Sequence, residues 1–258
     1  LSVLLSGCNK EQVSGAPAAA PQVTVVTLQS QTVSLSSDLP GRTSPFRMAE
    51  VRPQVDGIIL NRLFKEGSEI KAGQQLYQID PSTYEASLAS AEASLKRYRS
   101  LSQRYQQLIG EQAVSQQEYD TAKAQELEAA AQVKSAQINL RYTKVLAPID
   151  GRVGRSSVTE GALVTNGQSA SLATIQQLDP IYVDVTQSYG NMLKLRQALD
   201  SGQLQKAGDN AAKVRLTLED GSVYPREGSL EFSEVSVDET TGSVTLRAVF
   251  PNPDHTLL

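Results

Sequence analysis

Two stretches of this chain decide its fold: VRPQVDG at Val51–Gly57 and VLAPIDG at Val145–Gly151. They open two segments that align without a gap at a constant offset of 94 residues, with seven identities in all. The shared turn residues are Asp56, Gly57, Gly67 and Gly73 in the first copy, and Asp150, Gly151, Gly161 and Gly167 in the second. Short runs of Val, Ile and Leu between such turns predict strands. Because one copy is too small to bury a core, we expect both to form one β-sandwich with internal pseudo-symmetry.

The sequence between the two copies has a helical period. Seam positions spaced alternately by three and four residues run through 84–109 and again through 119–140. This is the heptad pattern of helices that pack side by side, and the mostly apolar seam is broken only at Ser102 and Glu126. We therefore expect two helices, each at most about 40 Å long, that pair as an antiparallel hairpin.

Residues at the helix ends support this prediction. Asp80 is a good N-cap, and Pro81 fits the first helical position. Gly110 is suited to the left-handed conformation that often ends a helix. Ser115, followed three residues later by Glu118, predicts a capping box at the start of the second helix.

Composition excludes several classes of function. The chain has 258 residues and a net charge of −4, so it lacks the basic character of a nucleic-acid-binding protein. It contains one Cys and one His, which argues against a thiolate or imidazole metal site and against a disulfide scaffold. A serine triad would have to use His255, near the end of the chain. We expect no enzymatic activity, no cofactor, no metal and no nucleic-acid partner.

The first residues resemble the end of a lipoprotein signal peptide. Leu5-Ser6-Gly7-Cys8 is similar to the bacterial lipobox, in which the Cys becomes lipidated. The alternative is a short apolar strand with a buried Cys8. We assign residues 1–8 to the signal-peptide end, and the polar, Ala- and Pro-rich residues 9–22 to a flexible linker.

Taken together, these features resemble a known family, the periplasmic adaptor (membrane-fusion) subunits of resistance-nodulation-division (RND) tripartite efflux pumps, of the AcrA/MexA type. The motifs that carry the resemblance run along most of the chain. They are LPGRT at Leu39–Thr43, AEVRPQVDGI at Ala49–Ile58, EGSEIKAGQQLYQIDPSTY at Glu66–Tyr84, INLRYTKV at Ile138–Val145, VTEGALVTNGQ at Val158–Gln168, QQLDPIYVDVTQ at Gln176–Gln187 and GSVTLRAVFPNP at Gly242–Pro253.

The resemblance implies a mainly β, elongated, multidomain fold with a long antiparallel α-helical hairpin. The implied parts are a first strand of a membrane-proximal β domain at 23–33, a β-barrel from 34–46 and 176–250, a split lipoyl-like β-sandwich from 47–80 and 143–175, the hairpin at 81–142, and a return toward the membrane-proximal domain at 251–258. A helix over about Tyr189 to Leu199, with Met192 and Leu195 on its apolar side, is expected to plug the barrel.

The resemblance also implies function. The family joins an inner-membrane, proton-driven RND drug transporter to a TolC-type outer-membrane channel, assembles as a hexamer, and is anchored to the inner membrane by lipid, here on Cys8. An adaptor of an ABC-type exporter or a type I secretion system is the alternative. A carrier of lipoate or biotin would need a Lys on the turn between the copies, where the hairpin stands instead; Lys65 and Lys71 lie within the first copy.

A family motif at the hairpin tip matches Arg104, Leu108 and Ser115, and by resemblance these residues contact the channel. Arg104 and Leu108 are four residues apart, so they share one helix face. Other readings remain open at each position. Leu108 could flank the seam, Arg104 could be a solvated charge, and Ser115 is already explained as an N-cap.

Overall fold

The structure is a computed structural model that describes residues 24, 37–208, 210–232, 237–238 and 240–258. The chain divides into two compact units, Leu1–Asp38 and Leu39–Leu258, and every element below belongs to the second. The expected signal-peptide end with Cys8, the linker at 9–22 and, apart from Thr24, the strand expected at 23–33 lie outside the described residues.

Strands from the two sequence copies interleave. The first copy supplies β2 (Gly57–Arg62), β3 (Glu69–Ile70) and β4 (Gln75–Ile79), and the second supplies β5 (Lys144–Leu146), β6 (Gly151–Val153) and β7 (Leu163–Val164). β2 pairs antiparallel with β7, and β3 pairs antiparallel with β6, so both ladders join one copy to the other. β4 pairs antiparallel with β2 on one side and with β5 on the other, which gives a sheet of order β5-β4-β2-β7.

The interleaved strands close a single hydrophobic core. Because side chains alternate between the two faces of a strand, each short strand contributes its inward residues only. The buried members are Val51, Val55, Ile59, Ile70, Leu76, Tyr77, Ile79, Val145, Ala147, Val153, Val164, Leu172, Ala173 and Ile175.

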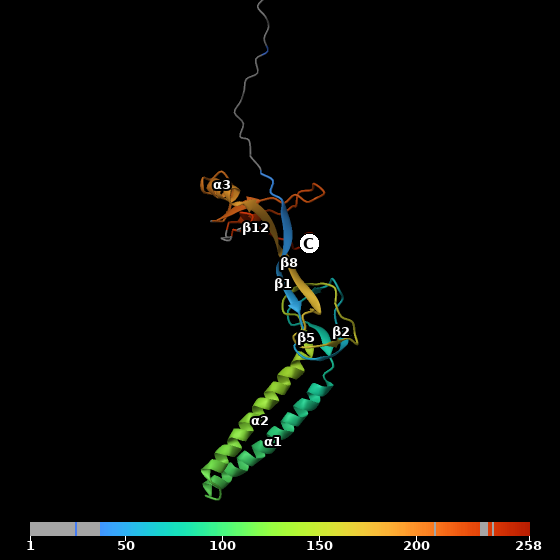
Figure 1. The fold of residues 1–258 in the computed structure, drawn as a ribbon, viewed down its shortest axis with the longest axis vertical. Coiled ribbons are helices and arrows are strands. Elements are labelled where there is room, and N and C mark those ends of the chain that lie inside the picture. Colours follow the sequence, from blue (N-terminus) through green and yellow to red (C-terminus); the bar gives the residue numbers. More distant parts are fainter. Residues whose placement is uncertain (1–23, 25–36, 209, 233–236, 239) are drawn as a thin grey trace, which may run out of the picture. The chain divides into compact units, whose positions relative to one another are not determined.

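Two long strands, β1 (Gly41–Val51) and β8 (Ala173–Ser188), continue from this core into a second one. They pair antiparallel along their length, with one irregularity between Pro45 and Arg47, beside the domain boundary expected after residue 46. Ile175 of β8 is buried in the first core and Val183 in the second. Figure 1 shows the two strands side by side.

The second core is enclosed by a larger sheet. β12 (Ser243–Phe250) pairs with β8 on the side opposite β1, and β11 (Gly228–Glu231), β10 (Ala211–Val214) and β9 (Lys206–Gly208) follow in order. Helix α3 (Tyr189–Asp200) packs Met192, Leu195 and Leu199 against this core, as the apolar spacing predicts.

The segment 251–258, expected to start a return to the membrane-proximal domain, packs on the second core. Leu257 is buried there. Asn252 holds it there, because its fully buried amide donates to the Leu178 and Leu257 carbonyl oxygens at 3.0 and 2.9 Å. Satisfying a buried amide in this way fixes the segment to the barrel.

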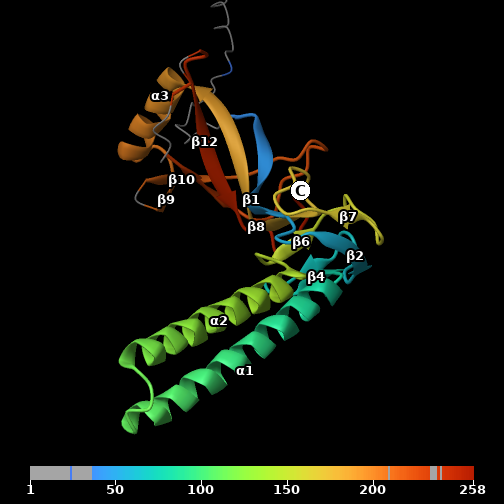
Figure 2. The same ribbon diagram turned by 60° about the horizontal axis from the view of Figure 1, so that its bottom comes forward.

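The hairpin consists of α1 (Ser82–Gly110) and α2 (Gln116–Tyr142), which lie side by side in Figures 1 and 2. Both helices extend the expected ranges by a few residues. α1 is inserted after β4 and α2 leads into β5, so the hairpin grows from neighbouring strands of the first core.

Two helix-end predictions differ from the structure in detail. The first helix begins one residue later than predicted, yet the Asp80 carboxylate still accepts from the Ser82 backbone N–H at 3.0 Å. The prediction for Gly110 is wrong: Gly110 is the last helical residue, and the left-handed conformation falls on Gln112, with φ of 55°.

Gly57 and Gly151 show why the repeat needs glycine at its turns. Both have φ near +150°, at 153° and 146°, a region that other residues rarely occupy. A Cβ on Gly57 would approach the Ile79 side chain at 2.6 Å, whereas a Cβ on Gly151 would approach the Gln176 backbone oxygen at 2.4 Å. A side chain can shift more easily than a paired strand.

We therefore predict an order of destabilisation among alanine variants. Gly151→Ala should cost the most free energy of unfolding, Gly57→Ala less, and Gly73→Ala least, because Gly73 has open space around it. Strained backbone conformations cost of order 1–3 kcal/mol each. Urea unfolding of the three variants tests the order, and a Gly73→Ala cost equal to that of Gly151→Ala would contradict it.

Candidate functional site

The tip of the hairpin carries the three residues of the expected docking motif. Arg104 and Leu108 belong to the last turns of α1, and Ser115 immediately precedes α2. Arg104 and Ser115 are exposed, and Leu108 is half-buried. Arg104 makes no ion pair or hydrogen bond with any residue that the structure describes, so its guanidinium is available to a partner.

Ser115 forms the predicted capping box. Its hydroxyl oxygen accepts from the Glu118 backbone N–H at 3.2 Å, and the Glu118 carboxylate accepts from the Ser115 backbone N–H at 2.9 Å. The Ser115 backbone N–H, foremost, and the Ser115 hydroxyl, which also donates to the Glu118 carboxylate at 2.9 Å, hold the pKa of the Glu118 carboxyl below its usual range. The capping box thus fixes the point where the second helix begins.

Beside the motif lies an open hollow of about 540 Å³ between the two helices. Leu101 and Tyr105 of α1 line one side, and each is three residues before a motif residue, so Arg104 and Leu108 flank the hollow. The remaining lining residues are Ser115, Gln117, Glu118, Thr121, Ala122 and Gln125. Sequence reasoning assigned Tyr105 to the seam alone. It did not single out Gln117 or Thr121, because both are polar and lie outside the heptad seam positions.

The two polar interruptions of the seam meet inside the hairpin. Ser102 is buried, and the Glu126 side chain is 14% exposed. Glu126 pairs with Lys123 at 2.9 Å and with Arg99 at 3.3 Å. Its hydrogen bond from Lys123, followed by one from Ser102, lowers the pKa of the Glu126 carboxyl, against the opposing effect of burial.

The acidic turn residues of the repeat act across the two copies. Asp56 accepts from the Asn166 backbone N–H at 2.6 Å, and Asp150 accepts from the Ala72 backbone N–H at 2.8 Å. Asn166 and Ala72 are themselves 94 positions apart, so each aspartate holds the same turn in the other copy. The turn glycines Gly57, Gly67, Gly73, Gly151, Gly161 and Gly167 all have positive φ.

A second reciprocal pair involves two glutamates of the repeat. Glu66 accepts from the Ser156 backbone N–H at 2.9 Å, and Glu160 accepts from the Arg62 backbone N–H at 3.0 Å. Backbone bonds repeat the exchange, with Gly67 N–H donating to Val153 and Gly161 N–H donating to Ile59, both at 2.8 Å. Each of these bonds has a counterpart 94 residues away, so the sandwich has an internal two-fold relation.

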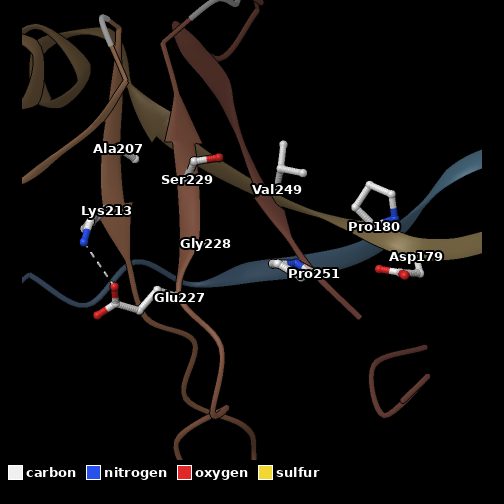
Figure 3. Close-up of a pocket in the computed structure, with 9 residues that line it drawn as sticks. All are labelled: Asp179, Pro180, Ala207, Lys213, Glu227, Gly228, Ser229, Val249 and Pro251. Carbon is white, nitrogen blue, oxygen red and sulfur yellow. Dashed lines mark hydrogen bonds and ion pairs between the residues drawn. The ribbon is translucent and has the colours of Figure 1, made fainter. Parts of the chain in front are cut away.

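A shallower hollow of about 380 Å³ lies on the barrel side, and Figure 3 shows its lining. Its charged groups already have partners. Lys213 and Glu227 pair at 3.4 Å, and the Asp179 carboxylate accepts from the Asn252 backbone N–H at 2.7 Å. The charged groups that line this hollow therefore already bond to other residues, and the rest of the lining is mostly apolar.

Neither metal chemistry nor a membrane span is evident in the described part of the chain. Within residues 37–208, 210–232, 237–238 and 240–258, no three His, Cys, Asp or Glu side chains gather as metal ligands. Among the helices of those same ranges, none has the length and apolar character needed to cross a bilayer.

Comparison with protein-family models identifies both cores. Residues 47–176 match the barrel-sandwich hybrid domain of RND membrane fusion proteins (MFP), and residues 180–258 match the β-barrel domain of the same proteins. The chain belongs to the RND membrane fusion protein family. The second match runs through residue 258, in agreement with the packing of 251–258 on the barrel core.

Curated relatives are similar along the chain. The multidrug/solvent efflux pump periplasmic linker protein MepA of Pseudomonas putida is 73% identical over 259 residues, covering 100% of this chain and 67% of its own length. The multidrug resistance protein MexA of Pseudomonas aeruginosa is 66% identical over 254 residues, covering 98% of this chain and 66% of its own length. The chain thus spans about two thirds of these RND membrane fusion proteins.

Solved structures agree with the fold. A MacA–MexA chimera that contains the Pseudomonas aeruginosa MexA α-hairpin domain is 32% identical and has a TM-score of 0.70; the match covers 84% of this chain and 73% of the chimera. A putative efflux transporter from Bacteroides eggerthii, 21% identical, has a TM-score of 0.62 over 84% of this chain and 62% of its own. The expected family and the periplasmic-linker relationship are confirmed.

Proposed function

We propose that this chain is the periplasmic adaptor that joins an inner-membrane RND drug transporter to a TolC-type outer-membrane channel. The observation that carries the proposal is the hairpin tip, where Ser115 lines an open hollow and Arg104 and Leu108 follow its lining residues Leu101 and Tyr105 by three positions on α1. Relatives named as periplasmic linkers of multidrug and solvent efflux pumps support it. The RND membrane fusion protein models that match residues 47–176 and 180–258 favour an RND pump over the alternative, an ABC-type exporter or a type I secretion system.

Docking at the tip follows from the chemistry of the exposed groups. Arg104 offers an unpaired guanidinium with several donors, and Leu108 places apolar surface one turn away. Arginine beside apolar surface is characteristic of protein interfaces. The channel residues that fit this tip are therefore carboxylates or carbonyl oxygens next to a small apolar pocket. The proposed role is mechanical, and no group on the adaptor needs to perform catalysis.

Self-assembly, with a hexamer as the expected form, is supported by a difference between the two faces of the sandwich. On one face the cross-strand pair is Ile58 and Leu163, with exposed fractions of 45% and 71%. The equivalent pair in the other copy is Arg152 and Glu69, and Glu69 also lies 3.3 Å from His255. An apolar pair where the related position is charged is consistent with contact to a neighbouring adaptor.

The docking proposal predicts a separation of function from stability. Arg104→Asp should change the free energy of unfolding by no more than about 0.5 kcal/mol, because the side chain is exposed. It should abolish drug resistance and reduce crosslinking to the channel by about tenfold or more, because an inverted charge at an interface costs several kcal/mol. Drug susceptibility, a melting curve and channel crosslinking are measured in the same strains.

Lys96→Asp is the matched control, because Lys96 is exposed on the same helix, about two turns from Arg104 on the side away from the tip. This variant should keep wild-type resistance and crosslinking. If Arg104→Asp also retains both, Arg104 is a solvated charge and the docking proposal fails. If resistance and melting temperature fall together, the residue serves the fold instead.

We also propose that lipid on Cys8 holds the protein at the inner membrane, facing the periplasm. Cys8→Ala should remove the acyl chains and release the protein into the soluble periplasmic fraction, since stable anchoring by lipid needs more than one chain. Labelling with radioactive palmitate and membrane fractionation test this prediction. Palmitate incorporated into the Cys8→Ala protein would contradict it.

A further inference from the structure

The hairpin seam contains one polar layer in an otherwise mostly apolar interface. Ser102 of α1 is 2% exposed, although serine is usually found at the surface. Glu126 of α2 lies opposite, and it receives Arg99 from the facing helix at 3.3 Å. The Lys123 partner at 2.9 Å comes from the same helix as Glu126. Only Ser102 and Arg99 therefore make the layer depend on how the two helices are aligned.

Sliding the helices by one heptad would keep the apolar seam but break this layer. In one direction Glu126 would face Leu95, with Glu92 in the place of Arg99. In the other direction it would face Ile109, with Gln106 in that place. A mostly covered carboxylate that faces a second carboxylate, or that loses its donors on α1 and keeps only Lys123, is disfavoured. The observed alignment is the one in which both polar seam residues meet.

The glycine at the turn does not support this alignment. Glycine is the residue best suited to a left-handed turn, yet Gly110 is helical and Gln112 takes the positive φ of 55°. The slide that brings Glu126 opposite Leu95 would move the centre of the turn to about Gly110. The glycine preference thus favours a shifted hairpin, whereas the Ser115–Glu118 capping box and the polar layer both favour the observed one.

We propose that Ser102 and Glu126, with Arg99, form a register-defining layer that aligns the two helices and so positions the tip. A single polar position in a coiled-coil seam can specify register. One heptad corresponds to a displacement of about 10 Å along the helix, which would carry Arg104 and Leu108 away from Ser115. The part of this inference that concerns docking rests on the proposed adaptor function.

The test traps each register with engineered disulfides in the full chain, with Cys8→Ser so that only the introduced thiols are present. The observed register places Ala91 opposite Ala136, so Ala91→Cys with Ala136→Cys reports it. The slide toward Gly110 places Ala91 opposite Ala129, so Ala91→Cys with Ala129→Cys reports that slide. In the observed register the second pair is about 10 Å apart along the axis, too far for a disulfide.

Each reporter is combined with Ser102→Leu and Glu126→Leu, which make the layer apolar. We expect the yield of the slide-reporting disulfide to rise by about tenfold or more over its yield with the wild-type layer. The reason is that the slid register no longer places the Glu126 carboxylate opposite an apolar or acidic side chain. The melting temperature should stay equal or rise, because apolar replacements of buried polar groups are often stabilising. Ser102→Ala with Glu126→Ala gives the same readout if the leucine variant fails to fold.

Glu126→Gln is the conservative control. Its amide can still bond with Ser102, and, unlike a leucine side chain, it still presents an oxygen to Arg99. Its slide-reporting disulfide should remain close to background. If the leucine and alanine layers both yield only the observed-register disulfide, the polar layer does not define register and the proposal is overturned.

Channel crosslinking from the tip and drug resistance are measured on the same layer substitutions in the chain that keeps Cys8 and carries no reporter cysteines, because loss of Cys8 is itself expected to release the adaptor. A slid hairpin should lose this crosslink together with drug resistance. A slid hairpin that crosslinks at the wild-type level would count against the docking role of the tip, while the disulfide result would still establish the register function of the layer.

Discussion

The reciprocal pairing of the two sequence copies is the constraint on which the rest of the structure depends. Asp56 holds the Asn166 turn, and Asp150 holds the Ala72 turn, so neither copy completes its own turns. The β2–β7 and β3–β6 ladders also cross between copies. The core can therefore close only when chain segments on both sides of the hairpin come together, which fixes the base of α1 beside the base of α2.

A second consequence concerns the link between the two cores. β8 is paired on one side by β1 and on the other by β12 through the stretch Ile181–Val185. Such a doubly paired strand has its backbone groups satisfied over that stretch and resists local opening. The Asn252 side chain adds a hydrogen bond to the Leu178 carbonyl oxygen, at the point where β8 passes between the cores. Backbone hydrogen bonds therefore run without a break from the barrel to the sandwich that carries the hairpin.

Much of this arrangement could be predicted from the sequence. The repeat at an offset of 94 residues predicts the two-copy sandwich, and the heptad spacing predicts the paired helices. The Ser115–Glu118 capping box predicts where the second helix begins. The Gly110 prediction failed because a turn preference of one residue was outweighed by the pairing of two helices of 29 and 27 residues. The role of Asn252 and the meeting of Ser102 with Glu126 could not be predicted, since each depends on residues far apart in the chain. The burial of Leu257 could not be predicted for the same reason, because it packs on core residues far from it in the sequence.

The central claim is that the two copies open and close as one unit, and native-state hydrogen exchange tests it most directly. The backbone N–H of Ile59 donates to Ala162, and the equivalent N–H of Val153 donates to Ser68. We predict that these amides have opening free energies within about 0.5 kcal/mol of each other. Asp56→Ala should lower both together by about 1 kcal/mol. A loss of protection confined to Ile59, with Val153 unchanged, would contradict the account.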